Sequence, residues 1–348
     1  MHSTSTDARL QHRLKKGESD ILVVVFSQVR VPPGKFGLER LFAGTRHHCL
    51  FLNDTANGWY IGLDADIDAL VEQAIGEVVP ARIIYYGSSM GGYGAMKTGL
   101  RRSDGAIHAF GPELRPGRPG YQSSAYGVAA GKHDLLDTRQ PDGAQRIDLY
   151  FGCLDPVDAA NAAYAFDQFP SAHIHLLTSS HANHDHLYSL NIIRKIIRTF
   201  ERDPENELAA RDLLSDTSLE TLATFGDVGE AMAAGSCRDN AHLRNLPEFD
   251  RNPGLMRAEA EILAMQDQFE AGVDLLTRAE EVIATDPVLK TLPKRWRKEL
   301  PLLKVRWLQQ AGKPMDAKAV LEQACATFPI DTAMRSLCGE LQVPLPHI

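Results

Sequence analysis

The stretch Arg82-Ile-Ile-Tyr-Tyr-Gly-Ser-Ser-Met-Gly-Gly-Tyr-Gly-Ala-Met96 decides the fold. The apolar run Ile83–Tyr86 predicts a short strand, and the Ala/Met/Leu-rich residues that follow predict a helix running to about Leu100. Between them, Gly87-Ser88-Ser89-Met90-Gly91 matches G-x-S-x-G, the pattern of a sharp strand-to-helix turn that exposes a serine. A Gly/Ser turn without chemistry is the alternative, but the flanking strand and helix favour the elbow. Ser89 is therefore the candidate nucleophile.

Apolar runs and helical patterns alternate on both sides of this stretch. Each apolar run is short and bounded by Gly, Pro, Asn, Asp or Ser, which predicts strands. The predicted strands are Ile21–Phe26, Cys49–Leu52, Ile83–Tyr86, Ala106–Phe110, Ile147–Phe151 and Ile174–Leu177, and the predicted helices are 64–79, 90–100, 159–169 and 187–200. Such alternation predicts an α/β fold with a mostly parallel, doubly wound sheet. Residues 111–145, rich in Gly, Pro and Ser, predict a lid or a binding loop.

The pattern changes near Asp203-Pro204, after which helical segments are separated only by Gly or Pro breaks. Residues 267–279 and 312–324 resemble each other, with Leu and Ala where the second helix of a tetratricopeptide-type hairpin would bury them. A plain α-bundle is the alternative. The predicted organisation is a polar leader (1–19), an α/β-hydrolase-type domain (20–202) and a helical, tetratricopeptide-like domain (203–348).

Charge and cysteine usage restrict the function classes. The 348-residue chain has a net charge of −8 and a pI of about 5.9, which argues against nucleic-acid binding. The basic group Arg194, Lys195 and Arg198 is typical of the solvated face of a helix. The scattered cysteines form no C-x-x-C pair, which suits a reducing compartment; they are Cys49, Cys153, Cys237, Cys325 and Cys338. With no signal-peptide or membrane-span pattern, we expect a cytoplasmic protein.

A serine nucleophile needs a base, and the base needs an orienting acid. Asp155 follows the strand Ile147–Phe151 and is the candidate acid, with Asp158 as the alternative. Three histidines follow the last strand: His184 is the first choice for the base, His186 the second and His181 the third. All these positions lie at the carboxyl ends of predicted strands, the edge at which ligands bind in open α/β sheets.

Two further site predictions concern the oxyanion and metals. The oxyanion hole is expected to combine the N–H of Met90 with an N–H from the loop after the first strand, at Ser27 or Gln28. The histidine cluster offers metal ligands as an alternative role. No matching set of carboxylates is evident in the sequence, so we expect neither a metal nor a cofactor.

The elbow, Asp155 and the histidine loop together resemble the α/β-hydrolase superfamily, over about residues 20–200. This resemblance implies Ser89 as nucleophile, Asp155 as orienting acid and one loop histidine as base; an HGG-type oxyanion motif is absent from the sequence. The implied activity is that of a serine hydrolase cleaving an ester through an acyl-enzyme. An O-acyltransferase that acylates a sugar or polysaccharide hydroxyl would use the same triad. A non-catalytic scaffold is the third reading.

The expected partners follow from these readings. The substrate would be a small-molecule or carbohydrate ester, and the helical domain offers a surface for a protein partner. We expect neither nucleic-acid binding nor a membrane span. Substrate identity is not encoded in any motif of this sequence.

Overall fold

The computed structural model describes residues 8–136, 145–236 and 241–345. The chain divides into two compact units, residues 1–226 and 227–348. In the part of the chain that the structure describes, no helix is long and apolar enough to cross a bilayer.

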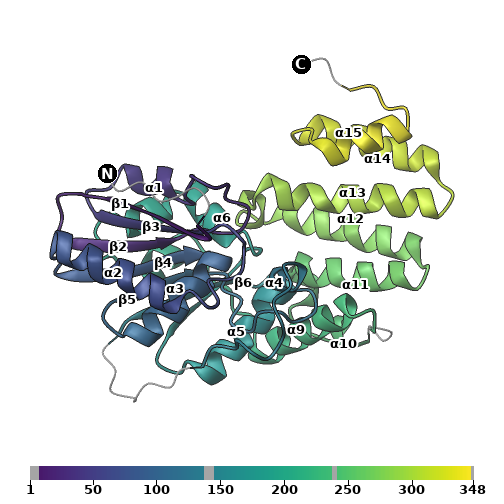
Figure 1. The fold of residues 1–348 in the computed structure, drawn as a ribbon. Coiled ribbons are helices and arrows are strands. Elements are labelled where there is room, and N and C mark those ends of the chain that lie inside the picture. Colours follow the sequence, from purple (N-terminus) through teal and green to yellow (C-terminus); the bar gives the residue numbers. More distant parts are fainter. Residues whose placement is uncertain (1–7, 137–144, 237–240, 346–348) are drawn as a thin grey trace. The chain divides into compact units, whose positions relative to one another are not determined.

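A seven-stranded sheet forms the centre of the first unit, in the order β1-β3-β2-β4-β5-β6-β7 (Figure 1). Strand β1 pairs with β3 in antiparallel register, and every other neighbouring pair is parallel. The expected mostly parallel α/β sheet is confirmed. The strands are β1 Leu10–Lys15, β2 Ile21–Phe26, β3 His48–Asp54, β4 Arg82–Ser88, β5 Ala106–Phe110, β6 Ile147–Gly152 and β7 His173–Leu177.

Helices flank this sheet and bury it. Every residue of β2 is buried, as expected for a central parallel strand covered on both faces. Helix α3 contacts β2, β4 and β5, helix α2 contacts β2 and β3, and helices α5 and α6 contact β6. The helices of this part of the chain are α1 Glu39–Ala43, α2 Asp64–Val78, α3 Met90–Arg102, α4 Gln122–Ala125, α5 Pro156–Gln168, α6 Asn183–Ser189 and α7 Ile192–Ile196.

Two segments differ from the sequence-based expectations. Strand β1 lies within residues 1–19, for which only a polar leader was expected. An edge strand has a single neighbour and needs few apolar residues, so Leu10–Lys15 carries no clear strand pattern. The expected helix 187–200 is instead α6 and α7, separated at Asn191, whose φ of 62° interrupts the helix.

The segment after β5 is more ordered than a structureless lid. Within its described part, 111–136, it contains α4, and it is tied to the helices beneath it. The hydroxyl of Tyr93 donates to the carbonyl of His133 (2.9 Å), and that of Tyr164 donates to the carbonyl of Leu135 (3.0 Å). Residues 137–144 lie outside the described residues.

Beyond β7 the described residues are helical, apart from a single bridge between Leu177 and Leu214. The first unit extends to Gly226, past the expected boundary at 203. Gly226 packs against α5, because an added Cβ would lie 2.6 Å from the Cβ of Ala160. The remaining helices are α8 Pro204–Ala209, α9 Leu219–Ala233, α10 Ala241–Arg244, α11 Pro253–Met265, α12 Phe269–Thr285, α13 Lys294–Gln310, α14 Pro314–Thr327 and α15 Thr332–Glu340, with 3₁₀ turns at Phe249–Arg251 and Leu289–Thr291.

The helices of the second unit pack against their neighbours in the chain. Contacts join α11 to α12, α12 to α13, and α13 to α14. The two similar segments, 267–279 and 312–324, coincide with the starts of α12 and α14. A buried apolar cluster joins α13, α14 and α15 through Val305, Leu321 and Met334. A tetratricopeptide-like repeat remains a prediction.

Candidate active site

Ser89 lies at the sharp turn between β4 and α3. Its φ of 55° and ψ of −121° are unusual for a residue with a side chain, and its N–H donates to the carbonyl of Phe110 (2.8 Å). The flanking glycines have no room for a Cβ. One on Gly87 would collide with the carbonyl of Gly91, and one on Gly91 would collide with the carbonyl of Phe26. The glycines of the motif therefore permit the turn that presents Ser89.

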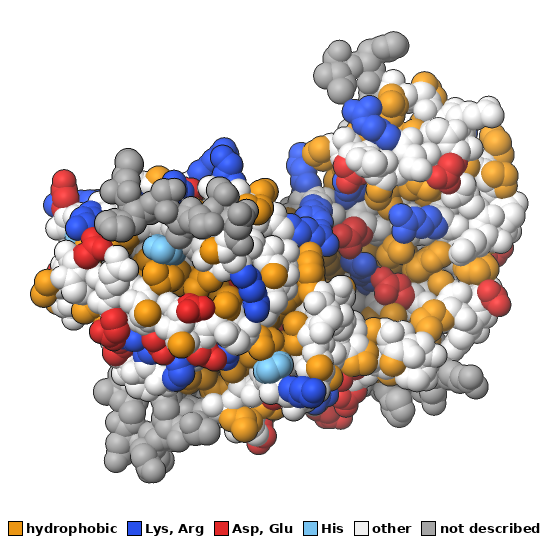
Figure 2. All heavy atoms as spheres, viewed as in Figure 1, with side chains coloured by type: hydrophobic (Ala, Val, Ile, Leu, Met, Phe, Trp, Pro, Cys, Tyr) orange, Lys and Arg blue, Asp and Glu red, His pale blue; other side chains and the backbone are white. Residues whose placement is uncertain are grey.

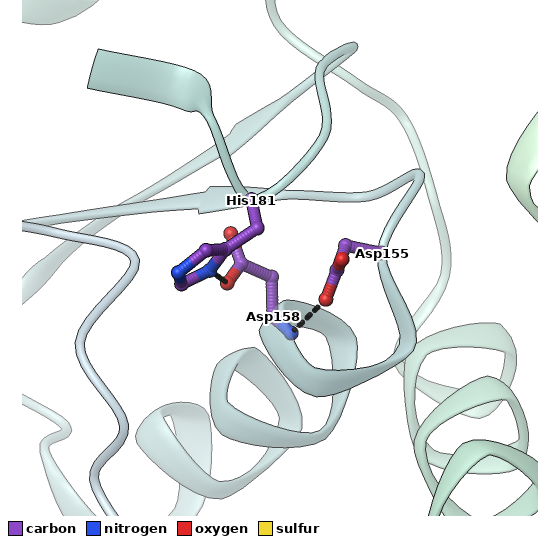
Figure 3. A group of neighbouring side chains, drawn as sticks. All are labelled: Asp155, Asp158 and His181. Carbon is purple, nitrogen blue, oxygen red and sulfur yellow. Dashed lines mark hydrogen bonds and ion pairs between the residues drawn. The ribbon is translucent and has the colours of Figure 1, made fainter. Parts of the chain in front are cut away.

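His181 is the histidine that lies beside Ser89. Its Nε2 lies 3.2 Å from Ser89 Oγ, and its Nδ1 lies 2.7 Å from Oδ1 of Asp158. Figure 3 shows the ring of His181 directed at the Asp158 carboxylate, which projects from the first turn of α5. The three side chains form a continuous chain of hydrogen bonds from hydroxyl to imidazole to carboxylate.

A close contact between backbones brings the acid and the histidine loop together. Gly152, the last residue of β6, has no space for a Cβ because the carbonyl of Ser180 lies against it. Oδ2 of Asp158 accepts hydrogen bonds from the N–H of Gly152 (2.7 Å) and from Nδ2 of Asn183 (3.0 Å). These bonds fix the carboxylate of Asp158, and its other oxygen accepts from His181.

Asp155 has a different place. It is the N-cap of α5, and its Oδ1 accepts from the N–H groups of Val157 (2.9 Å) and Asp158 (3.1 Å), the second of which is drawn in Figure 3. It makes no hydrogen bond to His181. Asp155 therefore contributes charge near the imidazole, whereas Asp158 contacts it directly.

The other two candidate histidines point into the protein interior. Helix α6 begins at Asn183, so His184 and His186 lie inside a helix and only His181 remains in the loop. The Nε2 of His184 pairs with the hydroxyl of Tyr86 (2.8 Å), and the Nδ1 of His186 pairs with Ser179 Oγ (2.9 Å). Burial lowers the pKa of His186 to about 4. The structure thus brings the third-choice histidine, and neither of the first two, to the serine.

Two residues that the sequence analysis missed complete the surroundings of Ser89. The Ser89 hydroxyl donates to Oε1 of Gln122 in α4 (3.3 Å). Glu113 is buried, and its carboxylate accepts from the N–H groups of Gln122 (2.6 Å) and Ser123 (3.1 Å). The available signal was position, because Glu113 follows β5 by three residues, at the same sheet edge as the elbow. No sequence signal marks Gln122.

The three predicted oxyanion donors are not equivalent. The N–H of Ser27 donates to the carbonyl of Leu52 (2.9 Å) and is therefore already occupied, and the Ser27 hydroxyl accepts from the N–H of Gly37 (2.9 Å). Among the described residues, the N–H groups of Met90 and Gln28 have no hydrogen-bond acceptor. The start of α3 packs on the end of β2, since Gly91 touches Phe26 and Ser27. Met90 and Gln28 thus offer two free N–H groups from neighbouring segments.

The negative charges of three carboxylates raise the pKa of His181. Burial alone would lower the pKa of His181, but Asp158, Asp155 and Glu113 outweigh that effect and raise the pKa to about 10. Burial also raises the pKa of Glu113. A raised pKa favours the imidazolium form, in which Nδ1 would donate to Asp158 and Nε2 to Ser89. The Ser89 hydroxyl has one proton, which it donates to Gln122 in this state.

Asp155, Asp158 and His181 also offer one ligand atom each within 4.8 Å, a spacing compatible with a metal ion. The two carboxylates already accept hydrogen bonds from N–H groups: Asp155 from the backbone at the start of α5, and Asp158 from Gly152, Asn183 and His181. An ion would have to displace the Nδ1–H of His181 from Asp158. The hydrogen-bond pattern therefore fits a proton relay better than a metal centre.

Comparison with known proteins gives weak structural likenesses. No family model matches the chain, and no curated protein matches it in sequence. A capsule O-acetyltransferase of Neisseria meningitidis serogroup A is 17% identical, with a TM-score of 0.44, over 55% of this chain and 92% of that one. An alpha-beta serine hydrolase homologue from Coxiella burnetii is 12% identical, with a TM-score of 0.38, over 56% of this chain and 92% of that one. Est1E from Butyrivibrio proteoclasticus is 14% identical, with a TM-score of 0.40, over 57% of this chain and 95% of that one. Likenesses at these TM-scores establish no activity, so the function is argued from the geometry of the site.

Proposed function

We propose that this protein is a serine hydrolase that cleaves an ester through an acyl-enzyme, with Ser89 as nucleophile, His181 as base and Asp158 as orienting acid. One observation carries the proposal: the chain of hydrogen bonds from Ser89 Oγ to His181 Nε2 (3.2 Å) and from His181 Nδ1 to Asp158 Oδ1 (2.7 Å). Its position at a strained elbow between β4 and α3 supports it.

The first half of the reaction acylates Ser89. Neutral His181 takes the hydroxyl proton as Ser89 Oγ forms a bond to the ester carbonyl carbon, and the carbonyl oxygen becomes an oxyanion. The N–H groups of Met90 and Gln28 donate to that oxyanion. His181 then returns the proton to the leaving alkoxide, and the C–O bond of the ester breaks.

The second half releases the acyl group. A hydroxyl-bearing acceptor replaces the departed alcohol, His181 takes its proton, and the acceptor oxygen attacks the acyl carbon. The bond between the acyl carbon and Ser89 Oγ then breaks, and return of the proton from His181 to Oγ regenerates the enzyme. With water as acceptor the product is a carboxylic acid, whereas with a sugar hydroxyl the product is a new ester.

Asp158 has two physical tasks in this cycle. By accepting from Nδ1–H it holds the tautomer in which Nε2 has a lone pair toward Ser89, and it stabilises the imidazolium that forms. Asp155 and Glu113 add negative charge nearby without touching the ring. Their charge stabilises the imidazolium further and makes His181 harder to deprotonate.

Hydrolysis of p-nitrophenyl acetate by the full chain tests the proposal. We expect release of p-nitrophenol by the wild type and a loss of about 10³-fold or more in kcat/KM for Ser89→Ala. Product analysis with and without a sugar acceptor separates hydrolysis from acyl transfer. Equal rates for wild type and Ser89→Ala would reject the proposal, and the scaffold reading would then take its place.

A further inference from the structure

A cavity of about 830 Å³ lies in the first unit, away from Ser89. It opens at the amino ends of β2 and β4, where Ile21 and Arg82 line it, between residues of α1 and of α7. Ser89 follows the carboxyl end of β4, and at roughly 3.3 Å per residue the strand separates the two places by about 20 Å. The volume falls within the range of small-molecule sites. The cavity is therefore large enough for a ligand and distinct from the candidate active site.

Arginine dominates the lining of this cavity. Two carboxylates, Asp20 and Glu201, face five guanidinium groups, those of Arg40, Arg46, Arg82, Arg194 and Arg198. This excess of positive charge occurs in a chain whose net charge is −8. We refer to this cavity as the arginine groove.

Two of the arginines lack protein partners. Among the described residues, Arg40 and Arg198 make neither a hydrogen bond nor an ion pair, and both are exposed. Among the described residues, the side chain of Arg46 forms an ion pair only with the exposed Glu18 (Nη2 to Oε2, 3.1 Å). Elsewhere in this unit several arginines pair with acids, as where Arg101 pairs with Asp64 and Asp68, and acidic and basic side chains are interspersed near α2 and α3 in Figure 2.

The other arginines and the floor are held in place. Nη2 of Arg82 donates to the carbonyl of Thr199 (3.0 Å), and the guanidinium of Arg194 lies over the ring of Tyr188 (4.1 Å to its centre). Below them, buried His47 links Ser19 Oγ and the carbonyl of Ile197, each at 2.8 Å. A rigid floor and oriented guanidinium groups lower the entropy lost when a ligand binds.

Exposed arginines close together in the chain, such as Arg194 in α7 and Arg198 just after it, are usually only solvated. Here three separate segments place like charges around one cavity, and the resulting positive potential favours an anion there. The planar guanidinium fork matches phosphate oxygens in bidentate geometry, better than ammonium groups do. We propose that the arginine groove binds an organic phosphate of nucleotide or sugar-phosphate size, with Arg40 and Arg198 as the principal phosphate contacts.

Isothermal titration calorimetry on the full chain tests this inference, with pyrophosphate as the probe at low ionic strength. We expect micromolar binding by the wild type and at least tenfold weaker binding by the Arg40→Gln/Arg198→Gln double variant. Arg335→Gln, the same charge change at an exposed residue of α15 that does not line the groove, is the matched control and should bind within twofold of wild type. Ser89→Ala should also bind as wild type, because the active site is not involved.

A second series identifies the source of the phosphate. ADP and glucose 6-phosphate are titrated beside adenosine and glucose, and the better of the two phosphates indicates whether a nucleoside or a sugar fits the groove. We expect the phosphates to bind and the neutral compounds not to bind, with affinity falling as salt is added. The inference is overturned if no phosphate binds to the wild type, if the folded double variant binds as tightly as wild type, or if the neutral compounds bind as well as the phosphates.

Discussion

Two carboxylates lie within reach of His181, and they accept different hydrogen bonds. Asp158 accepts from the imidazole, whereas Asp155 accepts from the first N–H groups of α5. Both residues lie near the N-terminus of the same helix, so spacing alone does not assign their roles. Four donors decide the matter: two orient the Asp158 carboxylate, and two N–H groups hold the Asp155 carboxylate at the helix end.

The first prediction compares Asp158→Asn with Asp155→Asn. Asparagine at 158 has an amide in place of the acceptor that His181 needs, so kcat/KM should fall by about 10³-fold or more. Asparagine at 155 still caps a helix, so kcat/KM should fall by less than about tenfold and the free energy of unfolding should change little. Steady-state kinetics and thermal unfolding check both variants. A larger loss for Asp155→Asn than for Asp158→Asn would show that the acid is misassigned.

The second prediction concerns pH. His181 must be neutral to accept the Ser89 proton, and its neighbours raise its pKa from 6.5 to about 10. The kcat/KM of the wild type should therefore rise with pH, with its midpoint above 6.5. Glu113→Gln removes one of the charges that stabilise the imidazolium, so the midpoint should move to lower pH.

The pH profile also separates charge from structure at Glu113. A merely structural role would lower kcat/KM at every pH without moving the midpoint. Glutamine keeps one of the two acceptor oxygens, enough for the shorter bond from the N–H of Gln122, whereas the longer bond from the N–H of Ser123 is lost. A wild-type midpoint at or below 6.5 would contradict the electrostatic account.

At the scale of elements, the site depends on how closely three loops approach. The third prediction compares Gly152→Ala with Gly76→Ala. A Cβ at 152 would collide with the carbonyl of Ser180. The free energy of unfolding of Gly152→Ala should therefore be lower than that of the wild type by about 2 kcal/mol or more, and its kcat/KM should fall. Gly76 lies in α2 with open space around it, so alanine there should stabilise by about 0.5–1 kcal/mol.

Denaturant unfolding and the ester assay measure both glycine variants. Loss of activity in Gly152→Ala at a temperature where it remains folded would show that the contact positions the histidine loop. An unchanged stability for Gly152→Ala would contradict the close approach of β6 and that loop.

The strands of the sheet could be predicted because central parallel strands must be apolar on both faces. Ile21–Phe26 and Ala106–Phe110 match β2 and β5 residue for residue. The edge strand β1 could not be predicted in this way, since its exposed side tolerates polar residues. The elbow was predictable for a different reason: only glycine fits beside the crossing backbones, and that requirement is visible in the sequence.

The partners of Ser89 were harder to predict than the elbow. The choice between His181 and His184 depends on where α6 begins, and helix boundaries are the least certain part of a sequence pattern. Gln122 is 33 residues from Ser89 in the chain, and Glu113 is about seventy residues from His181. Such contacts are made by tertiary packing, so the sequence carries no sign of Gln122, and for Glu113 it offers only the position just after β5.

At the scale of the whole molecule, the two edges of one sheet have different chemistry. The carboxyl ends of β4, β6 and β7 carry Ser89, Asp158 and His181. The amino ends of β2 and β4 border the arginine groove. No described residue of the helical unit, 227–348, belongs to either set, and a protein partner for this unit remains a prediction.

Labelling by a fluorophosphonate probe, which reacts with activated serines, is the most direct test of the central claim that Ser89 is activated by His181. The panel is wild type, Ser89→Ala, His181→Gln and His184→Gln, each shown to be folded by circular dichroism. We predict labelling of the wild type and of His184→Gln, and no labelling of Ser89→Ala or His181→Gln. Labelling that survives in His181→Gln but is lost in folded His184→Gln would contradict the account.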